Sequence, residues 1–276
     1  MRKSDERALA DRTPSVIVDA SNETPHIGSY VAMWLWVGWF FTLPMLGISL
    51  PLLYAYCFPA FQIMGGLILA SLVYPTARRF QPAWGWAMGR WIMRSAVSYF
   101  SARVVYEDAA ALSAHDNVIY ALEPHDILPI GIFTLSSAVV EAVDVSKPRR
   151  GGMASILFYL PFVKHVYTWC DAVPADRSTL TECLNDRQSI MICPGGVKEV
   201  AYIAQQDPRK DCVLYLRARL GMLNLAVRTQ TPIVPYFCFG QRDVFDFFIP
   251  KGSLWKSLGR SSGFYPLIYF GLWGDT

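Results

Sequence analysis

Charged residues are scarce in this sequence, and one long part has none. Asp, Glu, Lys and Arg make up 17% of the 276 residues, and none occurs between Glu23 and Arg78. Hydrophobic residues make up 53%, more than an ordinary soluble domain carries. The apolar part from Tyr30 to Tyr74 is long enough for two bilayer crossings of about 20 residues each.

Three residues that disfavour a continuous helix lie near the middle of this stretch, namely Pro44, Gly47 and Pro51. We therefore predict a transmembrane helical hairpin over residues 29–77, with helices at about Tyr30–Leu50 and Leu52–Tyr74. Lysine and arginine lie on both sides of the hairpin and not in its connection, so the positive-inside rule places both flanks in the cytosol. A helix pair buried in a soluble core is the alternative. The polar residues 1–28 are expected to be disordered.

Motifs that identify metal or nucleotide-cofactor enzymes are missing. The six cysteines include no C-x-x-C pair and no matched histidine pair, so neither a zinc site nor a disulfide framework is indicated. The sequence also has no G-x-S-x-G, G-x-G-x-x-G, P-loop or H-E-x-x-H motif. We therefore expect no metal and no bound cofactor. No nucleic-acid partner is expected either, because the net charge is only +3.

Short apolar runs alternate with helical patterns after Val104. The runs at 117–122, 189–193 and 232–239 have the length and composition of strands, so residues 78–276 are predicted to form a mixed α/β domain on the cytosolic side. At 213–228 the spacing predicts a helix whose apolar face packs on the sheet, with Leu216, Leu220, Leu223 and Val227 on that face. Residues 81–101 form either a tryptophan-rich helix in the membrane interface or an amphipathic helix packed on this domain.

Glu123-Pro124-His125-Asp126 directly follows the first of these strand-like runs. Proline has no N–H and favours extended geometry in the residue before it, so the chain leaves the sheet here. Histidine is the natural general base near neutral pH, and α/β folds expose catalytic groups at strand ends. An ordinary histidine at a strand end is the alternative reading of His125.

Pro194-Gly195-Gly196 follows another strand-like run and leads to Glu199. Paired glycines let backbone N–H groups approach an anion or a developing oxyanion, although a simple strand-to-helix turn uses the same residues. A third segment places Arg177 after an apolar strand end and before a capping box formed by Thr179 with Glu182. Arg177 is a candidate phosphate ligand or an exposed arginine at a helix start.

Several blocks occur in a fixed order from the hairpin to the C-terminus. They are Glu123 to Gly131, Ser155 to Trp169, Val173 to Arg177, Pro194 to Glu199, Arg219 to Met222 and Val234 to Gln241. In this order they resemble the blocks of the type-2 diacylglycerol acyltransferase family. The first block of that family reads Glu-Pro-His-Ser, or His-Pro-His-Gly in animal members.

The resemblance implies an acyl-CoA-dependent O-acyltransferase that makes neutral lipid, most simply triacylglycerol from diacylglycerol. A glycerolipid-acyltransferase-like domain would follow the hairpin in the endoplasmic reticulum membrane, as a multi-pass protein that also associates with lipid droplets. Acyl-CoA is then a substrate, and diacylglycerol, membrane lipid and a homo-oligomer or paralogue are the partners. Monoacylglycerol, a fatty alcohol or a sterol are alternative acceptors, and an inactive lipid-binding scaffold is the alternative to an enzyme.

The resemblance also assigns roles to particular residues. His125 would activate the acceptor hydroxyl for direct attack on the thioester, with Glu123, Asp126 or the distant Glu199 as its partner. The residues expected to bind substrate are Pro194, Gly195, Gly196, Glu199, Arg177 and Arg219, the two arginines through the phosphates of coenzyme A.

Two features depart from the family pattern. Asp126 replaces a small serine or glycine and places a carboxyl group beside His125. The chain also stops at Thr276, where relatives continue, so we expect either a truncated sequence or a shortened member.

Overall fold

The computed structural model describes residues 15–108, 111–112, 114–136, 139, 148–196, 199–200, 214, 216–217, 220–248, 257 and 268–270. A five-stranded sheet in the order β5-β4-β6-β3-β7 forms its centre, and neighbouring strands in it run parallel. The strands are β3 (Ile119–Glu123), β4 (Arg149–Met153), β5 (Ala172–Pro174), β6 (Ser189–Ile192) and β7 (Ile233–Phe237). The predicted α/β class is confirmed, and the strands expected at 117–122, 189–193 and 232–239 are β3, β6 and β7.

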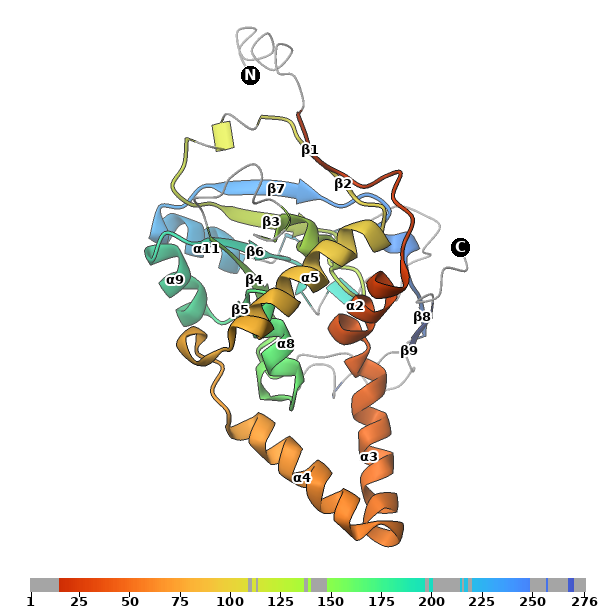
Figure 1. Cartoon of the computed structure of the whole chain (residues 1–276). Coiled ribbons are helices and arrows are strands. Elements are labelled where there is room, and N and C mark those ends of the chain that lie inside the picture. Colours follow the sequence, from red (N-terminus) through yellow and green to blue (C-terminus); the bar gives the residue numbers. More distant parts are fainter. Residues whose placement is uncertain are drawn as a thin grey trace, which may run out of the picture.

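Helices cover both faces of this sheet (Figure 1). On one face α9 (Arg177–Asn185) and α11 (Leu220–Thr229) pack against Ile119, Ile190 and Ile192. The other face meets α2 (Ile27–Val37), α5 (Ala83–Tyr99), α8 (Val163–Trp169) and the 3-10 helix η2 (Ile130–Leu135). Because side chains alternate along a strand, Tyr120 and Leu122 belong to this second core. A parallel sheet covered on both faces explains why β3 is buried at every position.

The buried face of α11 differs from the prediction. Leu225 and Ala226 are its buried residues, whereas Val227 is 77% exposed and Leu220 is 59% exposed. The periodicity correctly indicated a helix, but the choice of face was wrong because the apolar residues occur on more than one side. Contact with α9 and the sheet, rather than hydrophobic spacing, decides which side is covered.

Helix α5 packs on the domain, as the second reading of residues 81–101 expects. Gly85 and Gly89 lie against α8 so closely that a methyl group at Gly85 would overlap the Trp169 indole, and one at Gly89 would overlap the Trp169 carbonyl. Ile92 and Ala96 on the same side are fully buried. Trp84 and Trp91 stay partly exposed, and the Trp84 ring lies edge-on to the Trp169 ring with the two centroids 4.9 Å apart.

The apolar stretch forms α3 (Trp39–Tyr56) and α4 (Phe58–Val73), which project from the domain and meet at their far ends (Figure 1). The expected break at Pro51 is wrong, because Pro44 and Pro51 both lie inside α3 and the chain turns at Cys57. Within the described residues no single helix is long and apolar enough to cross a bilayer, while the bent pair Ile27–Val37 and Thr42–Tyr56 meets these two criteria jointly. The hairpin therefore stays a prediction.

Two small antiparallel sheets complete the described fold. β1 (Ser15–Asp19) pairs with β2 (Arg103–Tyr106), and β8 (Asp246–Phe248) pairs with β9 (Ile268–Phe270). The expected disorder of residues 1–28 is therefore wrong from Ser15 onward, because backbone pairing with β2 orders this segment. Short 3-10 helices occur as η1 (Arg78–Phe80), η3 (Ser155–Tyr159) and η4 (Gln241–Asp243).

Candidate active site

The sequence motifs meet at the carboxyl edge of the sheet. β3 ends at Glu123 with β6 and β7 as its two neighbours, so the segments that follow these three strands share one edge. The segment after β3 carries His125, the segment after β6 carries the two glycines, and the segment after β7 carries Gln241. Parallel pairing thus joins three sequence blocks that are far apart along the chain.

His125 is half-buried, and both its backbone and its ring are hydrogen-bonded. Its backbone N–H donates to Oε1 of Glu199 at 2.6 Å. Its ring Nδ1 lies 2.7 Å from the backbone carbonyl oxygen of Asp126. A carbonyl oxygen only accepts, so Nδ1 carries the proton in the neutral ring and Nε2 carries the basic lone pair. This tautomer is the one that a general base acting through Nε2 requires.

Glu123 and Glu199 form a pair of buried carboxyl groups beside this histidine. Glu199 is fully buried and Glu123 is 6% exposed. Burial raises the pKa of Glu123 to about 8, the negative charge of Glu199 acts in the same direction, and the Gly195 backbone N–H opposes both. Both oxygens of Glu123 are buried, and in the described part of the chain no group reaches them with standard hydrogen-bond geometry. Glu123 is therefore protonated near pH 7 and lies beside Glu199.

The two glycines are needed for different reasons. A methyl group at Gly195 would overlap the Glu199 carboxyl group, with its carbon Cδ at 2.6 Å. Gly196 has φ +56°, a conformation that side chains disfavour. Gly195 thus lets the Glu199 carboxylate reach the backbone of His125, and Gly196 turns the chain after it. Pro194, half-buried, leads into this turn.

Asp126 contributes its backbone to the site more directly than its carboxyl group. It has φ +50°, which aspartate tolerates better than most residues, and it is 3% exposed. Burial raises the pKa of Asp126 to about 6, against the opposing effects of the Ile127 backbone N–H and the charge of Arg242. The oxygen that accepts the hydrogen bond from the His125 ring is the backbone carbonyl oxygen of Asp126. A positive φ also explains why glycine fits this position in family members.

Gln241 is a positioning residue that the sequence reasoning did not assign. It is 2% exposed, and its Nε2 donates to the carbonyl oxygen of Pro124. Its Oε1 accepts from the backbone N–H of Gly131 at 2.9 Å. One amide therefore braces both ends of the segment that carries His125. The sequence did offer one signal, because Gln241 ends the block Val234 to Gln241 and follows β7 and Gly240.

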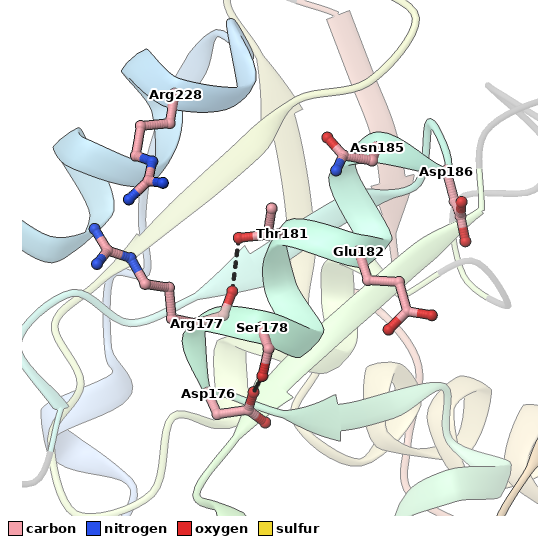
Figure 2. Close-up of a pocket in the computed structure, with 8 residues that line it drawn as sticks. All are labelled: Asp176, Arg177, Ser178, Thr181, Glu182, Asn185, Asp186 and Arg228. Carbon is pink, nitrogen blue, oxygen red and sulfur yellow. Dashed lines mark hydrogen bonds between the residues drawn. The ribbon is translucent and has the colours of Figure 1, made fainter.

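Arg177 lies in a different part of the molecule from the segment that carries His125. It lines a shallow groove of about 750 Å³ over α9 and α11, and no residue of the Glu123 to Asp126 segment lines that groove. Figure 2 shows Arg177 and Arg228 at one end of the groove, with Glu182 and Asp186 at the other. The cap of α9 is Asp176, whose carboxylate accepts from the Thr179 N–H at 2.9 Å, so the predicted capping box at Thr179 is wrong. Arg219 lies outside the described residues.

Comparison with known protein families gives one match that covers most of the chain. The family model described as diacylglycerol acyltransferase matches residues 53–274. The chain belongs to this family. Within the described residues, no cluster of three or more His, Cys, Asp or Glu side chains suits a metal ion.

Individual relatives of this family member are distant. 2-Acylglycerol O-acyltransferase 3 from Homo sapiens is 27% identical over 67% of this chain and 56% of its own length. Diacylglycerol O-acyltransferase 2 from Danio rerio is 27% identical over 81% of this chain and 63% of its own length. The human diacylglycerol O-acyltransferase 2 is 28% identical over 84% and 62%. The chain thus spans less than two thirds of the length of these proteins, and no solved structure matches it.

Proposed function

We propose that this chain is an acyl-CoA-dependent O-acyltransferase of neutral lipid synthesis, with His125 as the general base. The observation that carries the proposal is the hydrogen bond between His125 Nδ1 and the Asp126 carbonyl oxygen, at 2.7 Å, which leaves the basic lone pair on Nε2. Family membership and the names of the relatives support the reaction class.

The reaction is a direct transfer. His125 Nε2 takes the proton of an acceptor hydroxyl, and the hydroxyl oxygen attacks the thioester carbonyl carbon. The tetrahedral intermediate collapses as its carbon–sulfur bond breaks, and the departing thiolate of coenzyme A takes the proton from the imidazolium. No serine or cysteine nucleophile is needed. The half-buried Cys193 near Glu123 suits that role poorly, because desolvation raises the pKa of its thiol.

The surrounding residues hold the base and the thioester. Glu199 fixes the backbone of His125, and neutral Glu123 supports Glu199. The Gly196 turn is our candidate for the backbone donor to the thioester oxygen. Arg177 and Arg219 are proposed ligands of the phosphates of coenzyme A, which lie well away from the thioester and therefore suit a separate groove.

Diacylglycerol is the acceptor that we propose first. One relative is named for 2-acylglycerol and others for diacylglycerol, so monoacylglycerol is the second acceptor, with fatty alcohol and sterol as further alternatives. An inactive scaffold is the competing function, favoured by the buried Asp126 carboxyl group at a position where relatives have serine or glycine.

We also propose the setting that this chemistry requires. Residues 29–77 would attach the chain to the endoplasmic reticulum membrane or a lipid droplet, and residues 78–276 would form the cytosolic acyltransferase domain. The exposed apolar side chains of α3 and α4 support this, since Ile48, Ile63 and Leu69 are each at least 60% exposed.

The test is an assay of membranes from a host that lacks neutral-lipid synthesis, given labelled acyl-CoA and a panel of acceptors. His125→Ala should lower transfer to every acceptor by about 100- to 10,000-fold, because a general base contributes that much. His115→Ala, at an exposed histidine, is the matched control and should transfer like the unmodified chain. Full activity of His125→Ala would refute the base, and no product from the unmodified chain would favour the scaffold.

A further inference from the structure

A small cavity lies between the sheet and the helices on the α5 face, away from α9 and α11. Its volume is about 10 Å³, room for roughly one methyl-sized group. Its wall is mostly carbon and sulfur, and includes Trp36, Met93, Ile132, Met153, Tyr167 and Met191. The Tyr167 hydroxyl already accepts from the Trp39 indole N–H at 3.2 Å, and Ser136 adds one further hydroxyl.

Gly151 of β4 also lines the cavity, and packing does not explain why it is glycine. A methyl group there would lie 3.6 Å from Ile132, 3.8 Å from Met191 and 3.9 Å from Met153, which are ordinary contacts. Gly152 differs, since a methyl group there would lie 2.7 Å from Ile192 on the other face. Glycine weakens a strand and often marks close approach of another group. Gly151 therefore keeps open a space that alanine would fill without strain.

The wall of the cavity includes residues of the segment that follows His125 and of the helix that precedes the apolar arm, formed by α3 and α4. Ile132 belongs to η2, the segment that continues directly from His125, so the chain that carries the base also forms this wall. Trp36 belongs to α2, which leads into α3, the first helix of the projecting arm. Three methionines in the wall can change rotamer at low cost and enlarge the space.

We infer that this cavity receives the terminal end of the fatty acyl chain of acyl-CoA, and that Gly151 sets the acceptable chain length. The inference rests on the proposed function, because only an acyl-CoA substrate brings such a chain to His125. A longer chain reaches further into the cavity, so an added side chain at Gly151 excludes the longest donors first. The acyl chains of the acceptor are equally apolar and are the alternative occupant of the cavity.

The test varies the donor while diacylglycerol is fixed, with octanoyl-, lauroyl-, myristoyl- and palmitoyl-CoA. Gly151→Ala and Gly151→Val should lose turnover with the longest donors relative to the shorter ones, by roughly 10-fold or more for Val. Gly221→Ala on α11 is the matched control, since an added methyl group there meets nothing within 4 Å. It should keep the donor profile of the unmodified chain.

The outcomes separate this inference from the proposed function. An unchanged donor profile in both Gly151 variants would overturn the cavity assignment alone, and so would a shift that follows the chain length of the acceptor with a fixed donor. If Gly151→Val does not fold, the donor profile of Gly151→Ala alone tests the cavity assignment, because the methyl group of alanine makes only ordinary van der Waals contacts there. No turnover by the unmodified chain with any donor would instead overturn the proposed function.

Discussion

Single side chains in this site have charges that depend on their neighbours. Glu123 has an ordinary carboxyl group, yet its burial beside Glu199 keeps it protonated near neutral pH. The Glu199 carboxyl group beside it accepts the backbone N–H of His125. Perturbed carboxyl groups of this kind cluster at functional sites.

The pH dependence of stability tests this assignment. The unfolded chain releases the Glu123 proton near pH 4.5 and the folded chain near pH 8. Between these values the folded state binds more protons, so this group makes the protein less stable as the pH rises. Glu123→Gln should flatten that slope in thermal unfolding of detergent-purified protein, and should reduce transfer less than His125→Ala. A slope unchanged by Glu123→Gln would show that the pKa is not raised.

The two glycines offer a second test at this scale. Gly195→Ala should displace the Glu199 carboxylate that holds His125, and Gly196→Ala should strain a backbone at φ +56°. We expect each to lower transfer, by about 100-fold or more where a backbone donor to the thioester oxygen is lost. Gly221→Ala serves as the control for adding a methyl group. Normal turnover in folded variants would reduce this segment to a simple turn.

At the scale of elements, α8 holds the C-terminal end of α4, the second of the two helices that form the apolar arm. Lys164 Nζ donates to the carbonyl oxygens of Leu72 at 2.7 Å and Tyr74 at 2.9 Å, at the C-terminal end of α4. His165 Nε2 donates to the Ser71 carbonyl oxygen at 2.9 Å. Carbonyl groups at a helix end lack partners within the helix, and a cation there also suits the helix dipole. The direction of the arm is therefore fixed by the α/β domain.

Lys164→Met should loosen this junction. Removal of two charge-assisted hydrogen bonds should cost about 1–3 kcal/mol in the free energy of unfolding and make the junction after α4 more sensitive to protease. Arg79→Met, at an exposed cation over the Phe80 ring, is the control. Limited proteolysis in detergent, followed by mass spectrometry, measures both. Equal cleavage of the two variants would show that Lys164 does not hold the arm.

At the scale of the whole molecule, an apolar arm extends from an α/β domain whose candidate site lies at the strand ends (Figure 1). Acyl chains and neutral lipids reside in bilayers and droplets, so we propose that the arm brings the domain to them. The chain also spans only 56% of the length of 2-acylglycerol O-acyltransferase 3 and 63% of the length of the Danio rerio diacylglycerol O-acyltransferase 2. Its activity must accordingly be measured on this chain itself.

Membrane attachment should follow the arm. The full chain should stay in the pellet after carbonate washing, while a version in which a short linker replaces α3 and α4 should be released, because only residues 30–74 are long and uncharged enough to span and α2 is kept for the core. Protease added to sealed microsomes should digest the region after Arg78. Equal retention of both versions would contradict the hairpin, and protection of the later region would contradict the proposed topology.

The sequence by itself determined the local features of this protein. A strand followed by Glu-Pro-His, a glycine pair after another strand and a charge-free apolar stretch depend on near neighbours in the chain, and their order indicated the family. Tertiary structure decided which groups meet. The contact of Glu199 with the backbone of His125, the raised pKa of Glu123, the brace formed by Gln241 and the space beside Gly151 all depend on which strands lie side by side and which groups lose water. The buried face of α11 was mispredicted for the same reason, because packing partners are set by the fold rather than by the periodicity of one helix.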